Sequence, residues 1–195
     1  MLELGGIVLT AVLTTLGTWL VTKYTRRSEL TRDARYLAIR VVCSLDSFID
    51  ACLPYVYDKG AYRSDGAIDP TESAPILLLP DNVDWRSINP DLMYRVLMLP
   101  NKIALADRAI SFVAEVIAGP PDCDELFEER ALQYSKIGLE ALDVCGAMRK
   151  AYGMPQRSHV DFNPRESLMK CISDIEKNRS IRNAEQANFF VHSAS

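Results

Sequence analysis

The stretch from residue 4 to residue 22 contains no charged side chain, and it constrains this chain more than any other feature. A helix needs about 20 predominantly apolar residues to cross about 30 Å of hydrocarbon. Leucine, isoleucine and valine in the stretch favour insertion, whereas its threonines and glycines reduce the gain. We therefore predict a retained transmembrane helix and assign residues 1–27 to an N-terminal anchor with a basic flank.

The charges on either side of this segment predict its orientation. Glu3 is the only side-chain charge before it, and five basic residues follow it closely: Lys23, Arg26, Arg27, Arg32 and Arg35. Lysine and arginine accumulate on the cytoplasmic side of membrane helices. We expect a single-pass protein of the cell membrane, with the N-terminus outside and the C-terminal domain in the cytoplasm.

Two other interpretations of the segment stay open. A cleaved signal peptide would need a basic start, a shorter apolar run and a small-residue cleavage site, which this sequence lacks. A buried helix of a soluble domain is the second alternative, because the segment is only modestly apolar.

Small and hydroxyl-bearing residues recur every four positions within the segment, at Gly6, Thr10, Thr14, Thr18 and Thr22. This spacing places them along one slowly drifting helical stripe. Rows of small residues let membrane helices approach closely, and threonine hydroxyls form hydrogen bonds between helices. The stripe indicates a helix-packing face for self-association or a partner helix, unless each hydroxyl bonds its own preceding turn.

Composition narrows the class of the remaining chain. An apolar fraction of 48% with 25% charged residues is typical of a folded domain. A net charge of −4 argues against a nucleic-acid partner. The 5 cysteines form no C-x-x-C pair, which argues against zinc and favours free, buried thiols.

Apolar periodicity predicts an all-α domain over residues 28–178, an antiparallel helical bundle with a long loop near residues 54–88. We leave open whether the anchor helix continues into the bundle or bends near residues 25–28. Asn89 and Asn163, each followed by proline, predict helix starts, and Asp122 with Glu125 predicts another. We expect residues 179–195 to form a flexible tail. Each helix has a core stripe with steps of three and four: Leu30, Ala34, Leu37, Val41, Leu45, Phe48 and Cys52 in the first; Leu92, Val96, Leu99, Ile103, Ala106, Ile110, Val113 and Ile117 in the second; Phe127, Ala131, Tyr134, Gly138, Ala141, Cys145, Met148 and Tyr152 in the third; Leu168, Ile172 and Ile175 in the fourth.

No motif in the sequence predicts catalysis, a metal site or a bound cofactor. The phosphate-binding and dinucleotide-binding glycine patterns are absent, and neither histidine follows a glutamate by three residues. We expect the apolar run at residues 76–79 to pack over the core beside Trp85 rather than bind a ligand. Aromatic and basic groups that could converge on an anionic ligand or a partner are Trp85, Arg86, Tyr94, Arg95 and His159.

These patterns favour a module without enzymatic activity. We predict a membrane-anchored cytoplasmic helical domain that acts as a protein-interaction or scaffold element, with a protein partner or a second copy of itself. The alternative is a membrane-tethered enzyme or ligand sensor with an unfamiliar site in the bundle.

Overall fold

The computed structural model describes residues 2–64, 68–117, 123–157 and 162–193, with side chains at 29, 31–64, 68–117, 123–157 and 162–186. The described elements run in the order α1 (Leu2–Tyr57), β1 (Ala61–Tyr62), β2 (Ile68–Asp69), a 3-10 turn η1 (Trp85–Ser87), α2 (Pro90–Phe112), a π-helical turn η2 (Val113–Ile117), α3 (Asp124–Ala151) and α4 (Pro164–Ser193). The described chain is therefore mostly helical, and the predicted all-α helical bundle is confirmed.

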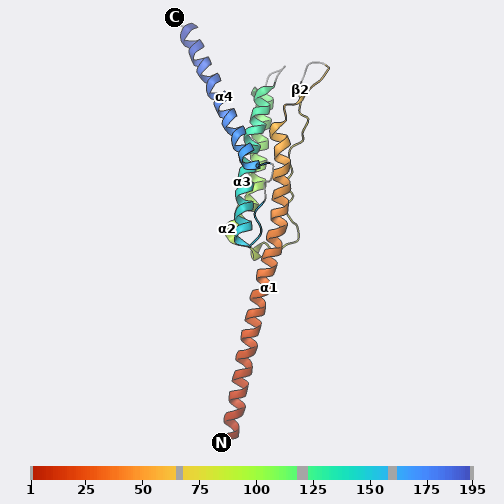
Figure 1. Cartoon of the computed structure of the whole chain (residues 1–195), viewed down its shortest axis with the longest axis vertical. Helices are drawn as coiled ribbons and strands as arrows, with labels where there is room; N and C mark the ends of the chain where they lie inside the picture. The colour runs from red at the N-terminus through yellow and green to blue at the C-terminus, as the bar shows by residue number, and fades with distance from the viewer. Residues whose placement is uncertain (1, 65–67, 118–122, 158–161, 194–195) are drawn as a thin grey trace.

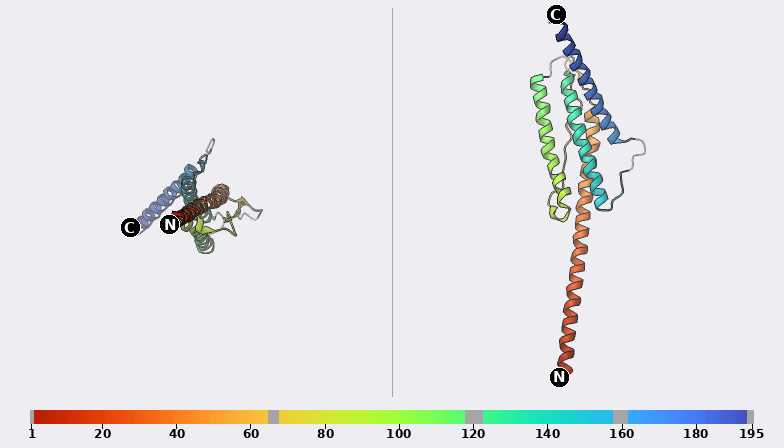
Figure 2. Two further views of the ribbon diagram at one scale, coloured as in Figure 1. Left: turned by 90° about the horizontal axis from the view of Figure 1, so that it is seen from below. Right: turned by 90° about the vertical axis from the view of Figure 1, so that its left-hand side faces the viewer.

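Helix α3 is the centre of the bundle and packs against α1, α2 and α4. Figures 1 and 2 show these helices side by side, with α1 and α2 running in one direction and α3 in the opposite one. The core is continuous between them, and its largest fully buried side chains include Phe48, Leu99, Tyr134 and Leu168.

Helix α1 continues without a break from Leu2 to Tyr57. The anchor helix therefore continues into the bundle and does not end near residues 25–28. Its first half projects away from the bundle, and its second half packs in it (Figures 1 and 2). Ala34 is the first buried side chain among those that the structure describes in α1, and the predicted stripe from Ala34 to Cys52 is buried throughout. Leu30, the first member of the predicted stripe, lies outside the described side chains.

The predicted transmembrane segment, residues 4–22, lies in the projecting half of α1. Among the residues whose side chains the structure describes, no helix is long and apolar enough to span a membrane. For residues 4–22 the structure gives the backbone only, so the predicted anchor and the stripe of Gly6, Thr10, Thr14, Thr18 and Thr22 lie outside the described side chains.

The predicted start of the long loop at Pro54 was wrong. Helix α1 includes Pro54 and ends at Tyr57. A proline removes one backbone donor from the helix, and Pro54 lies on the exposed face while its neighbours Tyr55 and Val56 are buried. Burial of the adjacent residues therefore keeps this last turn helical.

The chain between α1 and α2 is mostly extended. Its two short strands pair antiparallel, with Ala61 opposite Asp69 and Tyr62 opposite Ile68, a pairing that the sequence did not indicate. Leu77 and Leu79 pack on the core as predicted, whereas Ile76 and Leu78 are exposed on the other side. In an extended chain successive side chains point to opposite sides, so half of this run faces solvent.

Helix starts were predicted well where asparagine precedes proline. The Asn89 side chain accepts hydrogen bonds from the amides of Asp91 and Leu92, and the Asn163 side chain accepts one from Arg165. The predicted start at Asp122 lies outside the described residues. Helix α3 begins after Cys123, which adopts a left-handed conformation with φ of 48° and makes no side-chain cap.

Helix α4 is longer than predicted. Its predicted core stripe ends at Ile175, and the helix continues to Ser193 beyond the bundle (Figure 1). Arg179 bonds Glu128 and Glu129, and Arg182 bonds Glu128, so ion pairs with α3 take over where apolar contacts end. Flexibility of residues 179–195 stays a prediction.

Candidate functional site

The predicted ligand surface does not form one described site. Trp85 and Arg86 lie in η1, and Tyr94 and Arg95 lie on the first turns of α2. Trp85 packs partly against the core, whereas Tyr94 is 64% exposed. His159 lies outside the described residues. None of Trp85, Arg86, Tyr94 and Arg95 lines the cavity described below.

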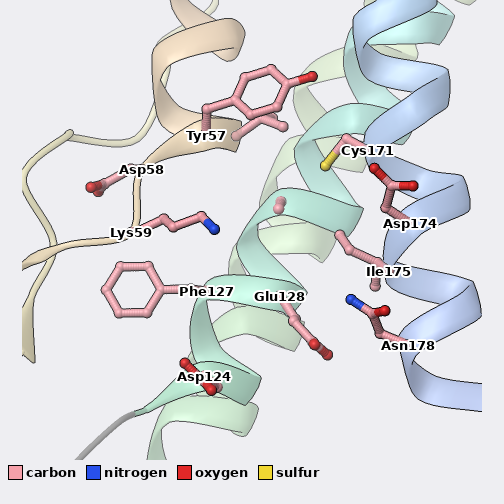
Figure 3. Close-up of a pocket in the computed structure, with 12 residues that line it drawn as sticks. Tyr57, Asp58, Lys59, Asp124, Phe127, Glu128, Cys171, Asp174, Ile175 and Asn178 are labelled. Atoms are coloured by element: carbon pink, nitrogen blue, oxygen red, sulfur yellow. The ribbon is translucent and has the colours of Figure 1, made fainter. Parts of the chain in front are cut away.

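A cavity of about 350 Å³ lies where the end of α1 meets the start of α3 and the middle of α4. Figure 3 shows Lys59 extending into it from the loop after α1, while Cys171, Asp174 and Asn178 of α4 turn toward it from the other side. Val56, Phe127, Ala131 and Ile175 provide apolar walls. The cavity therefore combines one cation, several carboxylates and apolar surface.

The hydroxyl and the thiol in this cavity are not activated for chemistry. Tyr57 donates a hydrogen bond from its hydroxyl to the backbone oxygen of Ser167 at 2.9 Å. Burial raises the pKa of the Tyr57 hydroxyl and that of the Cys171 thiol. Both groups therefore stay protonated at neutral pH, and a protonated thiol is a poor nucleophile and metal ligand.

Glu128 lines the cavity but is already paired. Hydrogen bonds from Arg182 and Arg179 lower the pKa of its carboxyl. Among the described side chains, no group of three potential ligands is placed to hold a metal ion.

Behind the cavity, Asp58 and Arg130 form a buried ion pair that fixes the loop after α1. Their side chains are 1% and 4% exposed, and Arg130 Nη2 donates to Asp58 Oδ2 at 3.2 Å and to the Glu72 backbone oxygen at 3.0 Å. The Arg130 guanidinium also lies 4.2 Å from the centre of the Tyr55 ring and 5.2 Å from that of Phe127. Its Nη1 is buried without a hydrogen-bond partner among the described residues.

Asp58 organises the loop by accepting hydrogen bonds from the backbone amides of Gly60, Thr71 and Glu72 and from the Thr71 hydroxyl. Burial alone would raise the pKa of this carboxyl, but these hydrogen bonds outweigh burial and lower it strongly. Gly60, with φ of 72°, leaves no room for a side chain because a Cβ would lie 2.7 Å from Phe127 and closer still to Ile68. Sequence reasoning missed this cluster, whose partners are 72 residues apart.

A second polar cluster joins α1, α3 and the chain after α3. Asp46 pairs with Arg149 and Arg157, and Arg157 also pairs with Asp50. Arg149 donates to the buried Cys145 sulfur at 2.9 Å. Burial raises the pKa of that thiol to about 12, so this cluster connects helices and leaves the cysteine protonated.

Comparison with known proteins gives no relative from which a function could be transferred: no family model matches the chain, and neither the curated proteins nor the solved structures contain a match.

Proposed function

We propose that this chain is a membrane-anchored helical module that presents its bundle to a protein partner at the cytoplasmic face of the cell membrane. The observation that carries the proposal is α1, one helix that contributes the longest stripe of the core and also projects beyond the bundle over its first half. The uncharged stretch at residues 4–22 lies in that projecting half. A projecting helix with a long uncharged, largely apolar stretch favours a lipid environment.

The continuous helix also gives the module a defined geometry. Thr22 ends the uncharged stretch, and Ala34 is the first buried residue among the described side chains of α1. At about 1.5 Å of rise per residue, these positions are about 18 Å apart along the axis. The bundle would stand clear of the headgroups on a short helical stalk, with its sides accessible to a partner.

The basic residues after residue 22 support the proposed orientation, with the N-terminus outside. The stripe from Gly6 to Thr22 would provide the contact with the membrane helix of a protein partner. Replacing Thr14 and Thr18 together with leucine tests it, because bulkier side chains would keep the two helices apart.

Extraction of membranes with alkaline carbonate tests the anchor. The full-length chain should stay with the membrane, whereas a variant with Val8→Arg and Leu13→Arg should be released. Each arginine at the centre of a membrane helix costs about 2.5–3.5 kcal/mol on the insertion scale. Release of the unmodified chain would refute the proposal, and protease protection of the N-terminus in sealed vesicles tests the orientation.

The cavity beside Lys59 favours one second candidate, a membrane-tethered ligand sensor. Its volume of about 350 Å³ lies within the range of small-molecule sites. Native mass spectrometry of the protein purified from its own membrane should then show a retained small molecule. Asn178→Trp, which narrows the cavity, should reduce the fraction of protein that retains the small molecule. Unchanged retention in that variant would show that the molecule binds elsewhere.

A further inference from the structure

Helix α2 has an apolar face on each side. Leu92, Val96, Leu99 and Ala106 are buried in the core. On the opposite side Tyr94, Leu105 and Phe112 are 64%, 62% and 57% exposed. Soluble surfaces tolerate single exposed apolar residues, but a contiguous row marks an interaction surface.

The three exposed residues share one line along the helix. Tyr94 and Leu105 are eleven residues apart, and Leu105 and Phe112 are seven apart, which are close to whole numbers of turns at 3.6 residues per turn. The positions between them continue the row with steps of four and three, as in a heptad seam, and are occupied by Met98, Asn101 and Arg108. We name the row formed by positions 94, 98, 101, 105, 108 and 112 the outer seam.

The charges near the outer seam are already engaged within the chain. Between Leu97 and Phe112 the charged residues are Lys102, Asp107 and Arg108. Lys102 bonds Glu140, Asp107 accepts a hydrogen bond from Tyr134, and Arg108 donates to the backbone oxygen of Ala104. Arg108 keeps its charge, but its side chain turns along its own helix toward the Ala104 backbone oxygen, so the contact that the outer seam offers is carried by Tyr94, Met98, Leu105 and Phe112.

We propose that the outer seam pairs with that of a second copy, in parallel, about a two-fold axis normal to the membrane. This inference rests on the proposed anchor, because anchors inserted in one orientation align the copies. Helices α1 and α2 both pack on α3 and run in the same direction (Figure 2), so aligned copies present their outer seams in parallel. Asn101 lies near the middle, where a polar residue in a heptad seam specifies register and dimer formation.

The available area fits a dimer held by its anchors. Tyr94 and Phe112 each leave about 100 Å² of surface free, since aromatic side chains bury about 150–250 Å² when covered. Together with Met98 and Leu105 of the outer seam and Leu97 beside it, these side chains offer on the order of 500 Å² per copy, and a pair reaches about 1,000 Å², the lower limit of a specific interface. Anchoring in one membrane raises the effective concentration and strengthens such a contact.

Cysteine cross-linking of the full chain in vesicles tests the parallel pairing. Asn101→Cys, in a background with Cys43→Ser and Cys123→Ser, should form a disulfide-linked dimer, since a parallel two-fold axis brings identical positions together. The control is Ala51→Cys, an exposed position of α1 in the same background. Equal cross-linking at both positions, none at position 101, or a product joined to a different protein would overturn the inference.

A second pair of variants separates the interface from folding. Leu105→Glu with Phe112→Glu should reduce the cross-linking of the Asn101→Cys variant by roughly ten-fold or more, whereas Met169→Glu with Ile181→Glu changes exposed apolar residues of α4 and should leave it unchanged. Circular dichroism confirms that both variants stay helical. Carbonate extraction of the same vesicles separates the two hypotheses: release refutes the anchor, and retention without cross-linking refutes the paired seam alone.

Discussion

Arg130 is a charged side chain inside the core, and its partners determine what it contributes to stability. Asp58, the Glu72 backbone oxygen and two aromatic rings surround its guanidinium. A buried ion pair stabilises little compared with an apolar replacement of both partners, but removing one partner leaves an uncompensated charge. This residue therefore serves to hold the loop in place.

Replacing Arg130 with methionine should lower the free energy of unfolding by about 3–5 kcal/mol, because Asp58 would stay buried without its counter-charge. Urea denaturation followed by circular dichroism measures the loss. Arg130→Lys should recover part of it, since the charge remains while the second hydrogen bond is lost. A loss below about 1 kcal/mol for Arg130→Met would contradict the assigned role.

Asp58 should make the domain sensitive to acid. Its pKa is lowered in the folded state, so its contribution is fully present above the unfolded value of about 3.9 and is lost as the pH falls toward the folded value. Glu128 and Glu129 contribute with the same sign. Denaturation between pH 5 and pH 2 should show a shallower decline of the free energy of unfolding for Asp58→Asn than for the unmodified chain. If the free energies of unfolding of the two proteins declined in parallel as the pH falls, the Asp58 carboxyl would not be the acid-sensitive group.

At the scale of elements, α3 packs against three neighbours because small residues let them approach. Gly138 faces Leu168 of α4 and Cys52 of α1. A Cβ at this position would lie 2.9 Å from a methyl carbon of Leu168, which is fully buried and has little room to move. Gly146 lies on the same helix, and a Cβ there would meet no atom within 4 Å.

These two glycines form a matched pair. Gly146→Ala should stabilise the domain by about 0.5–1 kcal/mol, because alanine favours the helix more than glycine does. Gly138→Ala gains the same propensity but overpacks the contact with α4, which typically costs about 1–3 kcal/mol. Thermal denaturation should place Gly138→Ala below Gly146→Ala, and adding Leu168→Val should narrow the difference. Equal melting temperatures would show that α4 moves away easily.

At the scale of the whole molecule, the continuous α1 makes the distance between bundle and bilayer a property of the fold. Cys43 is an exposed thiol on α1 and provides a native labelling site once Cys123 is replaced with serine. If residue 22 marks the edge of the hydrocarbon, Cys43 lies about 31 Å from it along the helix axis.

Energy transfer from a dye on Cys43 to acceptors in the bilayer should therefore report one narrow distance distribution. Inserting Gly-Gly-Ser-Gly after Thr25 should broaden it, because glycine-rich linkers are flexible. An equally broad distribution without the insertion would show that the stalk bends in solution.

The sequence by itself determined the local features of this protein. Periodicity located the buried stripes of α1 and α3 and most of that of α2, whose predicted last member, Ile117, is 53% exposed in η2. Asparagine followed by proline located the starts of α2 and α4. These signals are local because a helix buries residues three and four apart and its cap lies next to its first turn.

The tertiary structure alone decided where distant segments meet. It brought Asp58 to Arg130, extended α4 through Arg179 and Arg182, and left the outer seam of α2 uncovered. None of these features has a local signature, because each depends on which helix lies beside which, and that arrangement is set by packing of the whole core. The cavity beside Lys59 arises for the same reason, at a junction of three helices that no single segment encodes.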